Sequence, residues 1–282
     1  MPAKNVSEGI PGAQAVSRAL RVLRAVAKGR TIGINLAQLV RDTELNKPTV
    51  HRLLLALIAD GMVEQDTSSL RYFVGRECYV LGGIANERFG LGRDAADIVA
   101  RLARTSGDSA FFSIRSDVFA VCVLREDGDF PLKTHVLQPG TRHPLGVGAG
   151  SLAMLAAMRD DEVERCLKAN REILNRHYAN FSAALIRDEI ALTRQHGYSV
   201  NEGLVVQGSW GLGAAVHSPQ GEVVGALTIA AVESRLPKAR QAELGAVLLD
   251  AAQTLERHLV RAAAFRSDSP SRSARTKKHT IG

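Results

Sequence analysis

The chain has 282 residues, 45% of them apolar, and a formal net charge of +7, which suits two globular domains. No window approaches the roughly 18 apolar residues that a membrane span requires, and the start lacks the apolar core of a signal peptide. The three cysteines, Cys78, Cys122 and Cys166, are far apart and form no CxxC pair. This excludes a disulfide framework and a zinc knuckle. We expect a soluble, cytoplasmic protein with no metal, no other cofactor and no membrane partner.

The positive charge is concentrated at the two ends of the chain. Residues 1–75 hold ten Lys and Arg against six Asp and Glu, a net charge of +4. Residues 76–262 hold twenty-one against twenty-two, a net charge of −1, and residues 263–282 hold five against one, a net charge of +4. This asymmetry favours a nucleic-acid-binding head, a neutral body and a basic tail.

The first helix is expected at residues 13–27, after a Pro- and Gly-containing stretch at residues 1–12 that we expect to be disordered. Arg18, Arg21 and Arg24 lie outside its apolar stripe. A stripe with a period of 3.6 residues indicates an amphipathic helix. The expected stripe consists of Val16, Ala19, Leu20, Leu23 and either Val26 or Ala27.

A second helix, a tight turn and a third helix are predicted between residues 35 and 59. Asn35 can cap the second helix, with Gln38 three residues later to complete a capping box. The turn is expected at residues 42–45. The buried side of this second helix is expected to consist of Ala37, Leu39 and Val40.

The third helix has the features of a DNA-reading helix. Asn46 can cap it, and Pro48 falls in its first turn, where a missing N–H costs little. Lys47, Thr49 and Arg52 lie near its start and off its apolar stripe. A helix-turn-helix presents this part of its second helix to the major groove, where cations and hydroxyls contact phosphates and bases. The stripe consists of Val50, Leu53, Leu54 and Leu57.

Residues 62–65 and 71–74 are predicted to form two short strands, which would be the wing of a winged helix. The alternative is a basic helical hairpin that mediates protein contacts. Because caps, turn, exposed cations and wing agree, we favour double-stranded operator DNA as a partner. The predicted DNA-binding residues are Lys47, Pro48, Thr49, His51, Arg52, Arg18 and Arg71.

A helical linker is expected at residues 76–92, followed by an α+β domain at residues 93–262 with a mostly antiparallel sheet and helices beside it. The expected strands are residues 110–114, 118–125, 133–137, 211–217 and 223–230. The expected helices are residues 93–105, 150–158, 160–168, 182–196 and 238–263. The basic tail at residues 263–282 is expected to be disordered, and it either adds phosphate attraction or only aids solubility.

Several blocks of sequence occur in a specific order in both domains. The head contains AVSRAL at 15–20, LAQL at 36–39, NKPTVHRLL at 46–54 and RYFVG at 71–75, then Leu81-Gly82. The body contains PLGVGAG at 144–150, GYSV at 197–200 and SRL at 234–236. In these blocks the chain resembles the IclR family of bacterial transcriptional regulators, over nearly all of residues 13–262.

The resemblance implies a winged helix-turn-helix domain at residues 13–75 and a GAF-like α/β effector-binding domain at residues 93–262. It also implies a homodimer or homotetramer on operator DNA and a small organic effector. Its effector-binding positions correspond to Gly148, Ala149, Asn201, Ser209, Gly211, Thr228 and Ala230.

Three departures mean that the ligand class is not inherited from the family. Asn201 stands where members that bind small keto acids tend to have an acidic residue, and Ala215 stands where many have proline. Trp210 adds bulk, so we include it among the predicted effector-binding residues. It either lines an apolar pocket or fills a core or subunit interface. A regular strand cannot turn Ser209, Trp210 and Gly211 toward one pocket.

The glycine loop Gly146-x-Gly148-x-Gly150 opens a helix but lacks the Lys-Ser/Thr of a P-loop and the βαβ context of a dinucleotide site. The free N–H groups of a helix N-terminus can hold a carboxylate, and the glycines can equally serve close helix–sheet packing. The glycine loop would hold a carboxylate, and Trp210 would contact an apolar group. Together they favour an aromatic or aliphatic acid of a catabolic pathway as the effector.

No catalytic residue and no metal ligand is predicted. The sequence has no HExxH, no Cys/His pair with ligand spacing and no GxSxG elbow. His135 and His143, close before the glycine loop, can contact an anionic ligand or be ordinary surface or core histidines. The leading hypothesis is an effector-responsive transcriptional regulator that is not an enzyme. The alternative is a small-molecule-binding enzyme or sensor module that a basic head tethers to nucleic acid.

Overall fold

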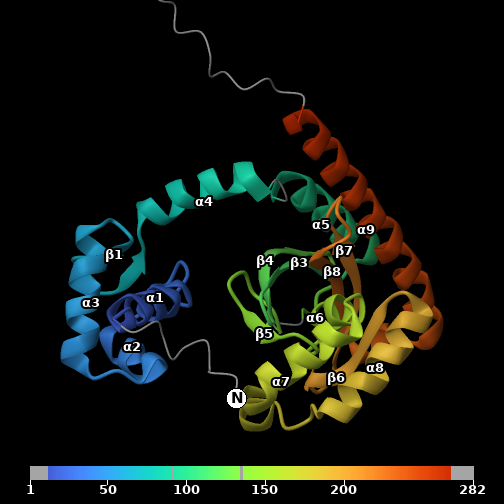
Figure 1. The fold of residues 1–282 in the computed structure, drawn as a ribbon, viewed down its shortest axis with the longest axis horizontal. Helices are drawn as coiled ribbons and strands as arrows, with labels where there is room; N and C mark the ends of the chain where they lie inside the picture. The colour runs from blue at the N-terminus through green and yellow to red at the C-terminus, as the bar shows by residue number, and fades with distance from the viewer. Residues whose placement is uncertain (1–11, 90–91, 134–135, 268–282) are drawn as a thin grey trace, which may run out of the picture.

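The computed structural model describes residues 12–89, 92–133 and 136–267 (Figure 1). The N-terminal head is a helix-turn-helix unit followed by an antiparallel hairpin, as the sequence predicts. The disorder expected at residues 1–12 and 263–282 falls mostly outside the described residues. For residues 263–267 it is wrong, because the last helix continues through them. The elements of the head are α1 (Gln14–Ala27), α2 (Leu36–Thr43), α3 (Lys47–Ala59), β1 (Val63–Gln65) and β2 (Tyr72–Val74).

Asparagine caps begin α2 and α3. Oδ1 of Asn35 accepts a hydrogen bond from the Gln38 N–H, and Oδ1 of Asn46 accepts one from the Thr49 N–H, each at 2.9 Å. The caps satisfy N–H groups that the first turn of a helix leaves without partners. Glu44 ends α2 in the left-handed conformation, with φ 53°. Local sequence therefore sets the angle at which α3 leaves the turn.

The core of the head follows the predicted periodicity in α3 and departs from it in α2. Ala37 is exposed, so its predicted place on the buried side is wrong, and Leu36 packs against the core instead. Leu36 and Ala37 are adjacent in one helical turn, so the apolar pattern alone does not show which of the two faces the core. The buried residues of α2 and α3 include, as predicted, Leu39, Val50, Leu54 and Leu57.

The helix α1 buries only part of the stripe that the sequence predicts, since Val26 is buried and Leu23 packs against the core. Val22, Ala25 and Val26 are its buried residues, whereas Val16 is 60% exposed and Leu20 is 43% exposed. Both faces repeat with the helical period, so contact with α2 and α3, and not periodicity, decides which one is buried. Part of the predicted stripe therefore lies on the surface.

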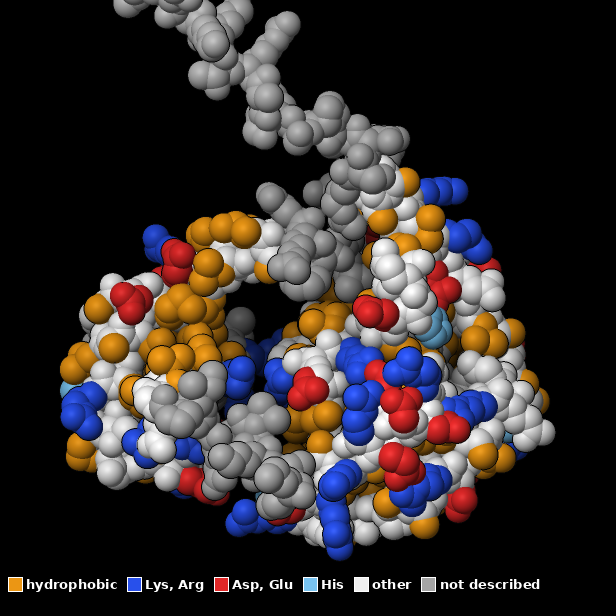
Figure 2. Space-filling model, viewed as in Figure 1, with side chains coloured by type: hydrophobic (Ala, Val, Ile, Leu, Met, Phe, Trp, Pro, Cys, Tyr) orange, Lys and Arg blue, Asp and Glu red, His pale blue; other side chains and the backbone are white. Residues whose placement is uncertain are grey.

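The helix α4 (Arg76–Phe89) runs from the head to the body (Figure 1). Figure 2 shows apolar side chains along it. These side chains, which we name the linker face, are exposed on the monomer: Tyr79 (87%), Val80 (50%), Leu81 (47%) and Ile84 (60%).

The body consists of an antiparallel sheet between two layers of helices. In the described residues the strand order is β5-β4-β3-β8-β7-β6, and each recorded pair is antiparallel. This confirms the predicted α+β class. The elements are α5 (Gly92–Ser106), β3 (Ser109–Ser116), β4 (Phe119–Asp127), β5 (Arg142–Pro144), α6 (Ala149–Ala156), α7 (Asp160–His177), α8 (Ala183–His196), β6 (Ser199–Val206), β7 (Ser209–His217), β8 (Val223–Val232), the 3-10 turn η1 (Glu233–Arg235) and α9 (Lys238–Ser267).

Two edges of the sheet differ from the prediction. The strand expected at residues 133–137 is wrong, because none of its described residues is in a strand and β5 pairs with β4 instead. A turn before β5 joins the Thr141 N–H to the Gln138 carbonyl at 2.8 Å. The edge strand β6 was not predicted, and its register against β7 shifts between Glu202 and Val206. In addition, α7 continues nine residues beyond its predicted end at 168.

Each face of the sheet has its own hydrophobic core. The helices α5 and α9 pack on one face, with Leu102, Leu248 and Leu255 buried against Leu212 and Leu227. The helices α6, α7 and α8 lie on the other face (Figure 1). Within the described residues no helix has the length and apolar character needed to cross a membrane.

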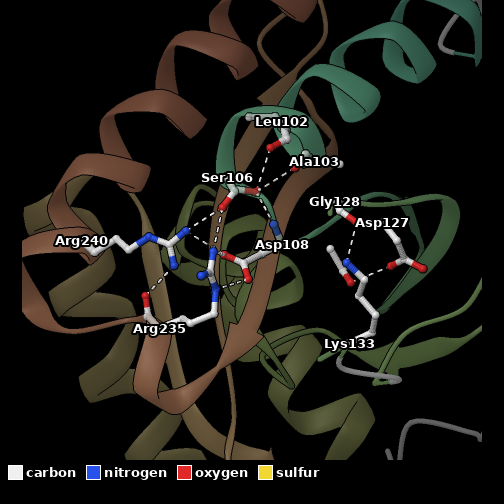
Figure 3. A network of polar contacts seen from close by, with 10 residues as sticks. Leu102, Ala103, Ser106, Asp108, Asp127, Gly128, Lys133, Arg235 and Arg240 are labelled. Atoms are coloured by element: carbon white, nitrogen blue, oxygen red, sulfur yellow. Dashed lines mark hydrogen bonds and ion pairs between the residues drawn. The ribbon is translucent and has the colours of Figure 1, made fainter. Parts of the chain in front are cut away.

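A buried carboxylate fastens α5 and α9 at one end of the sheet (Figure 3). Asp108, with a side chain 1% exposed, accepts hydrogen bonds from Arg235 Nε at 2.7 Å and from Arg240 Nη2 at 2.8 Å. Both arginines also donate to the Ser106 carbonyl, at 3.1 Å and 2.6 Å. Arg235 lies 3.9 Å from the centre of the Phe130 ring. We name Asp108, Arg235 and Arg240 the arginine clamp.

Candidate functional sites

The predicted reading helix presents its polar residues to solvent. Lys47, Pro48, His51 and Arg52 are exposed at the start of α3, and Thr49 is half-buried with its N–H used by the cap. The buried stripe on the opposite side leaves this face free to enter a major groove. The structure therefore brings together the five α3 residues predicted to contact DNA.

The two other predicted DNA-binding residues lie elsewhere in the head. Arg18 is exposed on α1. Arg71 is half-buried at the base of the wing, where Nη1 donates a hydrogen bond to the Gly33 carbonyl at 3.0 Å. Its guanidinium thus joins the hairpin to the loop that precedes α2. This contact limits how far Arg71 reaches toward a phosphate.

A cavity opens on the face of the sheet that carries α6. Its empty volume is about 590 Å³, a figure that includes open solvent at its mouth. The eight residues predicted to bind an effector all line it: Gly148, Ala149, Asn201, Ser209, Trp210, Gly211, Thr228 and Ala230.

Further lining residues were not among the eight predicted effector-binding residues. They are Phe111, Ser113, Ala120, Cys122, Val136, Leu137, His143, Val147, Gly150, Ser151 and Val205. Of these, the sequence analysis considered His143, as a contact for an anion, and Gly150, as part of the glycine loop. His135 lies outside the described residues. Most of the others are ordinary core residue types, and the pairing of β3, β4 and β5 brings Phe111, Cys122 and His143 to one space.

The N-terminus of α6 lies at the wall of the cavity. Gly148 is its N-cap with φ 81°, and its carbonyl accepts the first helical bond, from the Leu152 N–H at 3.0 Å. The N–H groups of residues 149–151 precede that bond, so they are directed outward from the helix start. A Cβ on Gly213 would lie 2.7 Å from the Ala149 carbonyl carbon, and one on Gly150 would lie 2.4 Å from Thr228 Oγ1. The structure therefore shows close helix–sheet packing, one of the two roles expected for the glycine loop.

Two buried polar atoms in the lining have no hydrogen-bond partner among the described residues. They are Thr228 Oγ1 on β8 and His143 Nε2 on β5, and Thr228 is 3% exposed. Buried polar groups in folded proteins are nearly always paired, so such atoms need an explanation. A bound ligand would supply the missing partners.

The two titratable groups of the described lining, the His143 imidazole and the Cys122 thiol, are uncharged at neutral pH. Burial lowers the pKa of the His143 imidazole below its ordinary value near 6.5, so the ring is neutral. Burial also raises the pKa of the Cys122 thiol to about 12. No lysine, arginine, aspartate or glutamate belongs to the described lining. The cavity thus combines apolar walls with neutral hydrogen-bonding groups.

Trp210 takes part in both of the roles that the sequence left open. It packs against the core between the sheet and α9, and it also belongs to the cavity lining with Ser209 and Gly211. β7 pairs regularly with β8 at these three residues, and a residue can line a cavity without turning its side chain into it. The shared lining therefore does not contradict the alternation expected of a regular strand.

Two family profiles cover the chain. The profile described as the IclR helix-turn-helix domain matches residues 15–67, and the one described as the bacterial transcriptional regulator IclR C-terminal domain matches residues 85–257. The chain belongs to the IclR family of bacterial transcriptional regulators. The family fold, a winged helix-turn-helix followed by an α/β domain, agrees with the architecture described above.

Individual relatives match along nearly the whole chain. The glycerol operon regulatory protein of Streptomyces griseus is 30% identical over 252 residues, which cover 87% of this chain and 96% of that protein. The HTH-type transcriptional regulator BhcR of Paracoccus denitrificans is 26% identical, with 88% of each chain covered. A crystal structure of an IclR transcriptional regulator from Alicyclobacillus acidocaldarius has a TM-score of 0.72 at 20% identity, covering 89% of this chain and 99% of that one.

The family assignment settles the general role of the protein. It is a transcriptional regulator, and the alternative of a tethered enzyme is not favoured, since these relatives are named as regulators. The described residues contain no group of three or more His, Cys, Asp or Glu side chains that could hold a metal ion.

Proposed function

We propose that this regulator binds operator DNA through α3 and that a small organic acid, bound in the body cavity, changes its affinity for the operator. The observation that carries the effector proposal is the unpaired Thr228 hydroxyl beside the start of α6. A carboxylate at this place would accept hydrogen bonds from the hydroxyl and from the N–H groups of residues 149–151.

The lining favours an organic acid with an apolar body. Cavities for small molecules are mostly apolar with a few placed polar groups, and here Phe111, Val147 and Val205 supply apolar wall. The described lining contains no aspartate or glutamate that would repel a carboxylate. Asn201 stands at the position where some members of the family have an acidic residue. A single anionic group anchored at a helix start, with an aromatic or aliphatic remainder, fits these walls.

The proposal is tested on DNA taken from the region upstream of the regulator's own coding sequence. In a mobility-shift titration, we expect salt-dependent binding that one or more members of a panel of aromatic and aliphatic carboxylic acids weaken or strengthen. The same acids should raise the melting temperature of the free protein, because they bind only its folded state. Operator binding that no acid alters, together with no thermal shift, would remove the organic-acid proposal.

Thr228→Val is expected to stabilise the protein while weakening acid binding. The substitution removes a buried hydroxyl without a partner and keeps the side-chain shape, so about 1–3 kcal/mol of desolvation cost disappears. Thermal unfolding without ligand should show a melting temperature raised by a few degrees, and calorimetry should show weaker binding of acids. Thr193→Val is the matched control, because the Thr193 hydroxyl donates to the Glu189 carbonyl at 2.7 Å, and its loss should not stabilise. A destabilised Thr228→Val would contradict this account of the hydroxyl.

We also propose that the protein is a homodimer or a homotetramer. A single winged helix makes too few contacts for typical operator affinity, and the linker face leaves large apolar side chains in water. Light scattering should give a mass near 61 kDa or 121 kDa, two or four times the 30.3 kDa chain.

A pair of equally exposed leucines tests where the subunits meet. Leu81 on α4 is 47% exposed and Leu192 on α8 is 48% exposed. Leu81→Glu should lower the measured mass and Leu192→Glu should not, because only the former places a charge in the proposed interface. A monomeric wild type with full operator affinity would refute the oligomer proposal.

A further inference from the structure

The second unpaired atom of the cavity, His143 Nε2, is not explained by an acid anchored at α6. His143 lies on β5 at the edge of the sheet, whereas Thr228 lies on β8, with β4 and β3 between them. The two residues also lie at different levels along the strands, because Thr228 pairs with Phe111 of β3 whereas His143 aligns, through Ala120 of β4, with Arg115 of β3. One carboxylate therefore does not satisfy both atoms, and a second polar group is required near His143.

Tyr178 holds the His143 ring from the side away from this unpaired atom. The Tyr178 hydroxyl lies 3.5 Å from Nδ1, and the two ring centres are 6.0 Å apart. Phe181 packs edge-on against the tyrosine at 6.3 Å between ring centres. The hydroxyl can donate to Nδ1 or accept from it. Nε2 is correspondingly either a donor or an acceptor, while its position stays the same.

The partner of Nε2 is best supplied by a hydroxyl group. A hydroxyl both donates and accepts, so it pairs with either tautomer, whereas a carbonyl pairs with only one. A second carboxylate is disfavoured, because the ring is neutral and the described lining holds no cation. An unpaired charge placed there would carry a large desolvation cost.

We propose that His143, oriented by Tyr178, is a specificity-determining residue that selects effectors bearing a hydroxyl group at the end opposite their carboxylate. The ligand class is that of hydroxy carboxylic acids whose two polar groups are separated by an apolar aromatic or aliphatic body. This inference rests on the proposed function, since it takes the acid group to be held at α6 and Thr228.

The experiment compares acids that differ only in the hydroxyl. The probe pairs are benzoate with 4-hydroxybenzoate, phenylacetate with 4-hydroxyphenylacetate, and hexanoate with 6-hydroxyhexanoate. Dissociation constants are measured by calorimetry on the full-length protein, beside the dicarboxylates terephthalate and adipate. In at least one pair the hydroxy acid should bind roughly tenfold or more tightly, because its analogue leaves Nε2 buried and unpaired. The dicarboxylates should bind more weakly than the preferred hydroxy acid.

His143→Phe should remove this preference and leave the affinity for the unhydroxylated acid nearly unchanged. Thr228→Val, in contrast, should weaken both members of a pair by the same factor, so that the preference remains. His196→Phe is the matched control. His196 stacks on Tyr198 with 5.9 Å between ring centres, but it is exposed and outside the cavity lining, so both affinities should persist.

The outcomes separate this inference from the proposed function. Acids that bind with equal affinity whether or not they carry a hydroxyl would overturn the role of His143 and leave the acid-effector proposal intact. The role of His143 would also be overturned if the His143→Phe variant still bound the hydroxy acids more tightly than their unhydroxylated analogues. If no acid of the panel binds, the proposed function fails, and the inference fails with it. The wild-type comparison needs no variant, so poor folding of His143→Phe does not prevent a decision.

Discussion

Replacing Asp108 by alanine is expected to destabilise the body by about 3–5 kcal/mol. The change removes the acidic member of a buried ion network and leaves the guanidinium groups of Arg235 and Arg240 near the surface of the core without their carboxylate. Loss of one partner of a buried pair is costly, because the remaining charge keeps its desolvation penalty. At roughly 2–4 °C for each kcal/mol in a domain of this size, the melting temperature should fall by about 10 °C.

An exposed ion pair provides the control for this prediction. Arg187 and Glu164 are joined by two hydrogen bonds of 2.7 Å and 2.8 Å, yet their side chains are 49% and 56% exposed. Water and salt screen such a pair, so Glu164→Ala should leave the melting temperature nearly unchanged. Equal losses in Asp108→Ala and Glu164→Ala would show that burial is not what makes the arginine clamp important.

A compensated variant separates the cost of unpaired charge from the loss of attraction. If Asp108, Arg235 and Arg240 are all replaced by apolar residues of similar volume, much of the lost stability should return, because no buried charge remains. A triple variant that is as unstable as Asp108→Ala would instead indicate that these hydrogen bonds, including those to the Ser106 carbonyl, are the source of the stability.

The head could be predicted from sequence because its determinants are local. Asn35 and Asn46 cap their helices within three residues of themselves, and the stripe of α3 is set by its own period. The face that α1 buries could not be predicted in the same way. Two apolar faces share one helix there, and only the packing of α2 and α3 selects between them.

The candidate effector site was predicted in part, and the limit has a physical cause. The glycine loop is a continuous block that can be recognised, and it gives Gly148 and Ala149. The wall formed by Phe111, Cys122 and His143 depends on how β3, β4 and β5 pair across long sequence separations. A histidine on a three-residue edge strand carries no local signal that its Nε2 will be left unpaired in a cavity.

Arg52→Ala is expected to weaken operator binding by about one to two orders of magnitude while the fold is retained. Arg52 is exposed beside Thr49 early in α3 and makes no ion pair within the described residues. It is therefore free to reach a base edge, and loss of one such contact costs ~1–3 kcal/mol. Mobility-shift titration at fixed salt measures the change, with an unaltered melting temperature as evidence of folding.

Two further substitutions decide what kind of contact Arg52 makes. Lys47→Ala removes a neighbouring cation on α3. If Lys47 contacts only phosphate, binding should weaken for every DNA sequence. The slope of the logarithm of the binding constant against the logarithm of salt concentration should then become shallower by about one. Arg52→Ala should instead reduce the discrimination between operator and unrelated DNA, because a base contact carries sequence information. Arg171→Ala removes an exposed cation from α7 in the body and should change neither quantity. Undiminished operator affinity in Arg52→Ala would show that α3 does not use this residue to read DNA.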